Sequence, residues 1–190
     1  VLIDHHLDPE TFAKYELHSI EAASTAELVY QLICEMEHED EVDAYMAECL
    51  YAGINTDTGS FRHSNVTKKV FDVSAALVEK GADTSKVAKL IYDTNSENRL
   101  RLLGYALSEN LKVIPEYNTA YFALSEKMLK RFNAQMGDTE GLVNYALSIK
   151  GIKLAALFKE SDHMIKISFR SVNDFSVNEL AKNNFSGGGH

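Results

Sequence analysis

The stretch Val1-Leu2-Ile3-Asp4-His5-His6 opens the chain and decides how its first part is interpreted. Three apolar residues, as in a short buried strand, are followed at once by one acidic and two imidazole side chains. In α/β sheets, the loops at the carboxyl ends of strands are where ligands collect. The stretch therefore predicts a buried strand that carries Asp4, His5 and His6 into a functional loop.

Helical patterns dominate the chain up to about residue 111. A second short strand is expected near residues 15–20, and helices are expected over 24–36, 42–54, 67–80, from 84 onward, and over 97–111. Ser24, with Glu27 three residues later, has the spacing of a capping box. The spacing of the apolar residues then becomes typical of strands, which are expected over 113–114, 119–124, 152–158 and 164–169. Helices are expected between them, over 126–132 and 139–147. The pattern predicts an α/β fold, in which a helix-rich remnant of a parallel sheet precedes a smaller α+β domain.

The domain boundary is placed where the composition changes, near residues 110–118. We assign residues 1–95 to a first domain, 96–115 to a linker helix and 116–190 to a second domain. The chain starts inside a strand without a methionine and stops inside what looks like a glycine motif. We therefore expect it to be a fragment of a longer protein.

The charge and the apolar pattern limit the partners. The net charge is −9, and no run of Lys and Arg with interleaved aromatic residues supplies the basic track that long nucleic acids need. No apolar run reaches the roughly 18 residues of a membrane span. Cys34 and Cys49 lack framework spacing and are expected to be reduced thiols of a cytoplasmic protein. A small phosphorylated ligand suits this chain better than a long duplex or a membrane.

A second candidate site is the cluster Asn55-Thr56-Asp57-Thr58-Gly59-Ser60. The alternative explanation is a helix end with a turn, where Asn, Asp, Thr and Gly are common. A carboxylate and an imidazole together suit a divalent ion such as manganese. Asp57 and His5 would supply only two ligands, so further carboxylates or histidines would have to come from elsewhere. Arg62 follows closely enough to reach a ligand.

The third feature combines Arg170 with the final residues Gly187, Gly188, Gly189 and His190. A guanidinium offers a planar fork of donors that suits phosphate, and consecutive glycines let backbone N–H groups converge on an anion. A surface Arg and a flexible glycine-rich tail are the alternative.

The order of these features resembles the DHH phosphoesterase superfamily. The branch with a DHH-associated C-terminal domain, the bacterial oligoribonuclease/pAp-phosphatase (nano-RNase) proteins, is most similar. The similarity covers essentially the whole chain and rests on the triplet, on residues 56–62 and on the terminal Gly-Gly-Gly-His. It implies that residues 1–95 are the C-terminal part of the DHH catalytic domain and residues 116–190 the substrate-binding domain. The family's upstream His and Asp motifs do not occur here, so the chain alone is expected to bind metal poorly and to be inactive.

The resemblance also implies roles for individual residues. His5 and Asp57 would bind a metal, in a site that holds two Mn²⁺ ions or, alternatively, Mg²⁺. His6 would act on the phosphate as a catalytic residue, and Asp4 would orient an imidazole. The substrate would be bound by Arg62, Arg170, Gly187, Gly188, Gly189 and His190.

These roles predict a manganese-dependent phosphoesterase that hydrolyses short oligoribonucleotides, pAp or cyclic-dinucleotide products by in-line attack of water between two metals. The expected partners are small nucleotides or short single-stranded RNA, and a homodimer is compatible with them. A RecJ-like single-strand exonuclease is an alternative that the acidic charge disfavours. An inorganic pyrophosphatase or exopolyphosphatase is a third possibility, but the terminal Gly-Gly-Gly-His favours a nucleotide ligand instead. A non-catalytic nucleotide-binding module that kept the fold also stays open.

Overall fold

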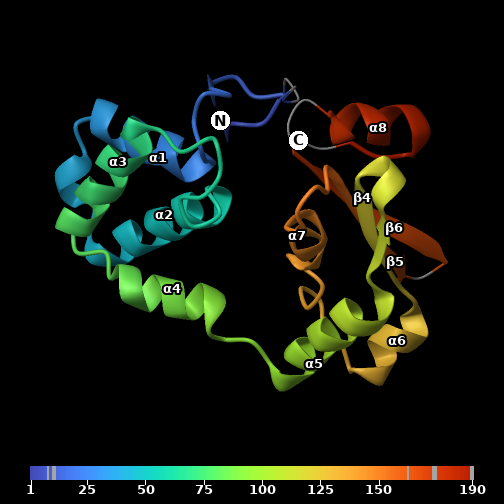
Figure 1. Cartoon of the computed structure of the whole chain (residues 1–190). Helices are drawn as coiled ribbons and strands as arrows, with labels where there is room; N and C mark the ends of the chain where they lie inside the picture. The colour runs from blue at the N-terminus through green and yellow to red at the C-terminus, as the bar shows by residue number, and fades with distance from the viewer. Residues whose placement is uncertain (8, 10–11, 162, 173–174, 189–190) are drawn as a thin grey trace. The chain divides into compact units, whose positions relative to one another are not determined.

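The computed structural model describes residues 1–7, 9, 12–161, 163–172 and 175–188. The chain forms two compact units, Val1–Thr94 and Asn95–His190 (Figure 1). Both combine helices with a sheet that contains a parallel strand pair, so the α/β class predicted from the sequence is confirmed. Among the described helices, none has both the length and the apolar character needed to cross a bilayer.

The first unit packs helices against a small parallel sheet. Strands β1 (Leu2–Asp4) and β2 (Glu16–His18) pair in parallel, which places Asp4 opposite His18. The other described helical elements of the unit are a 3₁₀ turn and four α-helices: η1 (Glu39–Glu41), α1 (Thr25–Glu35), α2 (Ala44–Asp57), α3 (Lys68–Glu79) and α4 (Thr84–Tyr92). The strands and helices therefore lie close to where the sequence pattern placed them.

The start of α1 follows the predicted capping pattern with one difference. The Ser24 hydroxyl accepts a hydrogen bond from the Glu27 backbone N–H at 3.1 Å, as a helix N-cap should. The Glu27 carboxylate is buried and accepts from the N–H of Ala23 at 2.8 Å, one residue before the cap. A second bond from the Gln31 amide, at 3.0 Å, completes the partners of this buried charge. The Ala22–Ala23 segment is thereby tied to the first turn of α1.

Helix α2 lies close against α1 and extends further than predicted. A Cβ atom on Gly53 would meet the Ala26 Cβ at 2.7 Å, so the two helices approach at a point that only glycine allows. The turn expected over residues 55–59 begins later, because α2 continues through Asp57 and is capped by Thr58. Both the N–H and the hydroxyl of Thr58 donate to the carbonyl of Ile54, at 3.1 and 2.7 Å. Asp57 is consequently the last residue of a helix.

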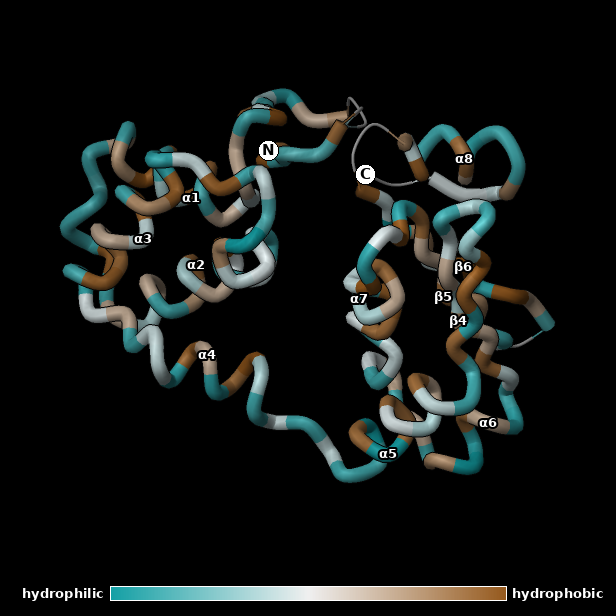
Figure 2. The backbone as a smooth tube through the Cα atoms, viewed as in Figure 1, coloured by the Kyte–Doolittle hydropathy of each residue, from teal (hydrophilic) through white to brown (hydrophobic). Residues whose placement is uncertain are grey.

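The second unit is built on a mixed sheet in the order β3-β4-β5-β6. β4 (Thr119–Leu124) and β5 (Leu154–Ser161) are parallel, whereas β3 (Lys112–Ile114) and β6 (Met164–Ser171) are antiparallel edge strands. The connection between β4 and β5 contains α6 (Glu126–Arg131) and α7 (Leu142–Leu147), and α8 (Val177–Asn184) follows β6. Helix α7 packs against the sheet, and apolar residues recur along both (Figure 2).

The core of this unit lies on one face of the sheet. Alternate residues of β4 are buried there, and the same core takes apolar side chains from α7 and β5: Ala120, Phe122, Leu124, Leu142, Val143, Ala146, Ala155 and Leu157. Residues 96–115 form α5 (Glu97–Tyr105), a π-helical turn (Ala106–Asn110) and β3, and they belong to this second unit. Ala106 is fully buried in the same core. The division of the chain into a catalytic and a substrate-binding domain stays a prediction.

Candidate functional site

The residues after β1 form a hydrogen-bonded group. Oδ1 of Asp4, the last residue of the strand, lies 2.6 Å from Nδ1 of His6 and accepts from the His6 backbone N–H at 3.1 Å. The hydrogen bond from the imidazole, followed by that from the backbone, holds the pKa of Asp4 below its ordinary value of 3.8. Asp4 is therefore an ionised carboxylate that orients the His6 ring.

His5 is oriented by a different partner. Its Nδ1 lies 3.3 Å from the carbonyl oxygen of Ala22, and its side chain is 13% exposed. A carbonyl only accepts, so this contact calls for a proton on Nδ1 and leaves the lone pair on Nε2. Metal-binding histidines characteristically donate from one ring nitrogen to a backbone carbonyl in this way.

The structure brings His5 and Asp57 together. Nε2 of His5 lies 3.7 Å from Oδ2 of Asp57, although the two residues come from β1 and α2. The separation is longer than a hydrogen bond and leaves both atoms able to face one cation. An imidazole nitrogen and a carboxylate oxygen are donors that suit a divalent ion, so the pair fits part of the expected metal site. Within the described part of the chain, these two are not joined into a group of three or more His, Cys, Asp or Glu ligands.

A left-handed turn follows Asp57. Gly59, Ser60 and Phe61 have φ angles of 55°, 59° and 60°. A Cβ on Gly59 would lie 2.3 Å from Nε2 of His63, so this glycine is required both by its conformation and by the ring packed on it. Nε of Arg62 donates to the Gly59 carbonyl at 2.7 Å. Arg62, the predicted substrate contact, is thus an exposed residue of this turn, in the same unit as His5 and Asp57.

A tyrosine that the sequence did not single out holds the segment around Asp57. The Tyr92 hydroxyl, at the end of α4, donates to Oδ1 of the buried Asn55 at 2.7 Å. The same hydroxyl accepts from the Ser60 hydroxyl at 2.6 Å. The end of α2 and the turn after it are therefore hydrogen-bonded to the end of α4. The sequence pattern around Tyr92 does not predict this contact.

Two further polar side chains lie near the site. Nε2 of His18 lies 2.7 Å from the His6 carbonyl. Nδ2 of Asn65 donates to the carbonyls of Ala23 and Asp57. Parallel pairing of β1 with β2 accounts for the position of His18, and this pairing is not visible in the local sequence.

The remaining predicted site residues lie in the second unit. Arg170 is an exposed residue of β6, and its Nη1 donates to the Phe169 carbonyl at 2.8 Å. The Phe169 and Phe185 rings, 5.4 Å apart, bring the segment after α8 against this strand. A Cβ on Gly187 would meet the Ala181 Cβ at 3.7 Å, an ordinary contact, so packing does not require this glycine. Gly188 is described too, whereas Gly189 and His190 lie outside the described residues.

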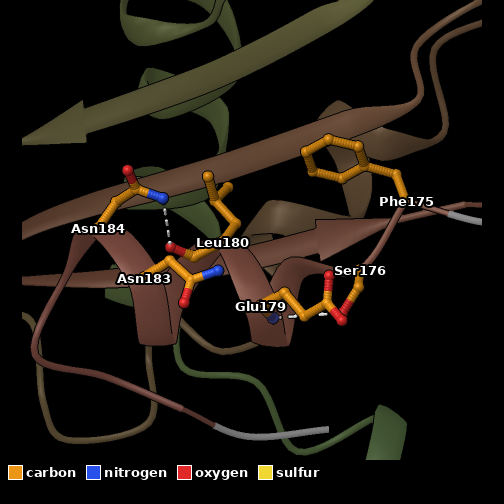
Figure 3. A pocket seen from close by; sticks show the side chains of 6 residues that line it. All are labelled: Phe175, Ser176, Glu179, Leu180, Asn183 and Asn184. Atoms are coloured by element: carbon orange, nitrogen blue, oxygen red, sulfur yellow. Dashed lines mark hydrogen bonds between the residues drawn. The ribbon is translucent and has the colours of Figure 1, made fainter.

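Helix α8 also borders a hollow of about 340 Å³ (Figure 3). Its lining consists of Phe175, Ser176, Glu179, Leu180, Asn183 and Asn184. The Ser176 hydroxyl accepts from the Glu179 N–H at 3.2 Å, and the Asn184 amide donates to the Leu180 carbonyl at 3.1 Å. These polar groups therefore serve the helix itself, and the hollow was not foreseen from the sequence.

Three matches with known proteins agree with this arrangement. Residues 117–190 match the DHHA1 domain. The chain is 30% identical, over 189 residues, to the bifunctional oligoribonuclease and PAP phosphatase NrnA of Bacillus subtilis; the match covers 99% of this chain and 59% of that protein. It is 30% identical, over 200 residues, to the cyclic-di-AMP phosphodiesterase GdpP of the same species, covering all of this chain and 28% of that protein.

A solved structure extends the likeness to the fold. An exopolyphosphatase-related protein from Bacteroides fragilis superposes with a TM-score of 0.93 at 42% identity, covering 99% of this chain and 55% of that one. The chain spans about three fifths of the length of the NrnA relative. The resemblance to DHH phosphoesterases with a DHHA1 domain, drawn from the triplet, the Asp57 segment and the glycine ending, is confirmed by these matches.

Proposed function

We propose that the protein containing this chain is a metal-dependent phosphoesterase that acts on short oligoribonucleotides, pAp or the products of cyclic dinucleotides. The observation that carries the proposal is the His5–Asp57 pair, with Nε2 and Oδ2 3.7 Å apart beside the Asp4–His6 hydrogen bond. The names of NrnA and GdpP, relatives that act on small nucleotides, support the substrate class.

His5 and Asp57 would hold a divalent cation, for which Mn²⁺ is our proposal. Bound divalent ions would make a water more acidic and would neutralise charge on the phosphate oxygens. His6 has a different task, because its Nδ1 is engaged by the ionised Asp4. A proton on the other ring nitrogen, Nε2, would let the imidazole donate to a phosphate oxygen or to the leaving oxygen.

The second unit would bind the part of the substrate away from the reacting phosphate. Among the described residues, Gly187 and Gly188 have no close neighbours that would explain them by packing, so their role would be to let the substrate approach the backbone. Arg170 would add a guanidinium that recognises a terminal phosphate. pAp and short products carry such a terminal phosphate.

A second candidate activity is hydrolysis of inorganic polyphosphate, which the name of the Bacteroides fragilis relative favours. A polyphosphate offers the same phosphate oxygens to His6 and Arg170 but has no base or ribose. Including polyphosphate among the tested substrates separates the two candidates.

The test is Mn²⁺-dependent hydrolysis by the full-length protein. A diribonucleotide, pAp, a linear cyclic-dinucleotide product, a long single strand and inorganic polyphosphate would be compared, with His5→Ala, Asp57→Ala and the surface control His38→Ala. Turnover of the small nucleotides that is lost in the first two variants and kept in the control is the expected result. Equal rates on the long strand would favour the single-strand exonuclease alternative. No turnover by folded protein with bound Mn²⁺ would identify a binding module instead.

A further inference from the structure

Asn65 connects the two segments that carry the candidate metal ligands. Its Nδ2 donates to the Ala23 carbonyl at 3.1 Å and to the Asp57 carbonyl at 3.2 Å. The first carbonyl lies directly after Ala22, which holds the His5 imidazole, and the second belongs to Asp57 itself. One side-chain amide thus bridges the supports of His5 and Asp57.

The orientation of the Asn65 amide follows from its neighbours. Both partners are backbone carbonyls, which accept hydrogen bonds and cannot donate, so the NH₂ group has to face them. Oδ1 is then turned away from both carbonyls. It is buried, and it has no hydrogen-bond partner among the described residues. Only the NH₂ end of the side chain therefore engages the surrounding protein there.

Both ends of this bridge are anchored in well-packed structure. Ala22 and Ala23 are buried, and the N–H of Ala23 is held by the Glu27 carboxylate. Asp57 is the last residue of α2, whose preceding turn contains the fully buried Ile54. A displacement of the Ala23 carbonyl would move the adjacent Ala22 carbonyl, which orients His5, and a displacement of the Asp57 carbonyl would move Asp57 itself. Both segments are held by the buried residues beside them and have little freedom to compensate.

We propose that Asn65 is a positioning residue that sets the spacing between His5 Nε2 and Asp57 Oδ2 by clamping the Ala23 and Asp57 carbonyls together. The inference rests on the proposed function in so far as the spacing serves a cation. Asn65 touches neither ligand side chain. It acts through the backbone of one ligand and through the segment that orients the other.

The chemistry of the clamp predicts a graded series of substitutions. Asn65→Asp keeps the shape but replaces both donors with acceptors beside two carbonyl oxygens, so it should be the most harmful. Asn65→Ala removes the donors without adding repulsion. Asn65→Ser can restore one donor and should partly rescue the alanine variant. The matched control is Ser74→Ala, which removes a buried hydroxyl that donates to the Val70 carbonyl at 2.7 Å in α3 of the same unit.

Two readouts on the full-length protein test the proposal. The first is Mn²⁺ affinity by titration calorimetry, where Asn65→Ala should bind about 10- to 100-fold more weakly, as loss of a supporting hydrogen bond does at metal sites. The second is backbone hydrogen exchange without metal. It should become faster in Asn65→Ala at the amides of Ser60, Arg62 and His63, whose acceptors lie in the Asp57 segment. Ser74→Ala should change neither readout by more than about twofold, even with a similar loss in melting temperature.

The outcomes separate this inference from the proposed function. Wild-type Mn²⁺ affinity in Asn65→Ala, or an equal loss in Ser74→Ala, would overturn the positioning role. Should Asn65→Ala fail to fold, Asn65→Ser is judged by the same two readouts and the same control. If the wild-type protein itself binds no Mn²⁺, the proposed metal site is wrong, and the exchange measured without metal still decides whether Asn65 clamps the two segments.

Discussion

The His5 imidazole and the Asp57 carboxylate face each other with 3.7 Å between Nε2 and Oδ2, and they are unequally exposed. The His5 side chain is 13% exposed and is held by the Ala22 carbonyl, whereas the Asp57 side chain is 43% exposed. His5 is therefore a ligand oriented in advance, and Asp57 is the more accessible partner that contributes negative charge.

This pair predicts non-additive losses of metal affinity. His5→Ala and Asp57→Ala should each weaken Mn²⁺ binding by at least about tenfold, because each removes one donor to the same ion. The double variant should lose much less Mn²⁺-binding free energy than the sum of the two single losses, since either single substitution already removes most of the contribution that the two ligands make together. Calorimetric titration of all four proteins checks this. Fully additive losses would show that the two residues do not share an ion.

The left-handed turn predicts a specific cost for filling Gly59. Gly59→Ala should destabilise the protein by more than about 1 kcal/mol, because its φ is 55° and the new Cβ would meet the His63 ring. Adding His63→Ala should recover part of the loss. Gly104→Ala is the control: Gly104 is in α5, and a new Cβ there would have no neighbour within 4 Å in the part of the chain that the structure describes. It should gain about 1 kcal/mol from helix propensity. Urea unfolding of the wild type and these three variants measures the differences.

Tyr92 predicts a stability effect through one hydroxyl. Tyr92→Phe should lower the free energy of unfolding by about 1–3 kcal/mol, because the amide oxygen of the buried Asn55 loses its donor. Tyr117→Phe removes a hydroxyl from a residue that is 76% exposed, and it should have almost no effect. Equal unfolding curves for the two variants would contradict the role assigned to the Tyr92 hydroxyl.

Gly187 predicts a change in substrate affinity without a change in folding. In Gly187→Ala the new Cβ would touch the Ala181 Cβ at 3.7 Å, an ordinary contact, so the melting temperature should stay the same. The methyl group would stand between the backbone and a bound nucleotide, so KM for pAp should rise several-fold while kcat changes less. Steady-state kinetics of the full-length protein measures the split. An unchanged KM for pAp would show that Gly187 does not contact the bound substrate.

Tyr30 predicts that stability falls in alkali. Burial, and then the hydrogen bond to Glu39, raise the pKa of Tyr30 above its ordinary value of 10. Above pH 10 the unfolded chain loses the phenol proton while the folded protein keeps it, so stability decreases with rising pH, by at most about 1.4 kcal/mol per unit for one such group. Below pH 10 the phenol is neutral in both states and contributes no slope. Urea unfolding from pH 8 to 11 should show a shallower decline for Tyr30→Phe.

Much of the local structure could be predicted from the sequence because it depends on contacts within one turn. Ser24 and Thr67 each accept a hydrogen bond from the N–H three residues later, and the helices begin after them. The predicted strands of the second unit also occur, since alternation along a strand decides which side chains are buried. The candidate ligands His5 and Asp57 were found from their residue types and their order.

Other features depend on how distant segments meet, and no local pattern contains them. One local feature was ambiguous as well: α2 runs through Asp57 because the Thr58 backbone and side chain bond back to Ile54, four residues earlier, whereas a run of Asn, Thr, Asp and Gly is also compatible with an earlier turn. The contacts of Tyr92 and Asn65 arise only once the helices are packed.

The sequence by itself determined where helices and strands begin, which family the chain resembles and which side chains can bind a cation. Only the tertiary structure decided that His5 Nε2 stands 3.7 Å from Asp57 Oδ2 and that Asn65 bridges their supports. The physical reason is range. A capping bond or a strand alternation acts over a few residues, whereas the spacing of two ligands is set by helix packing, such as the close approach of Gly53 to Ala26.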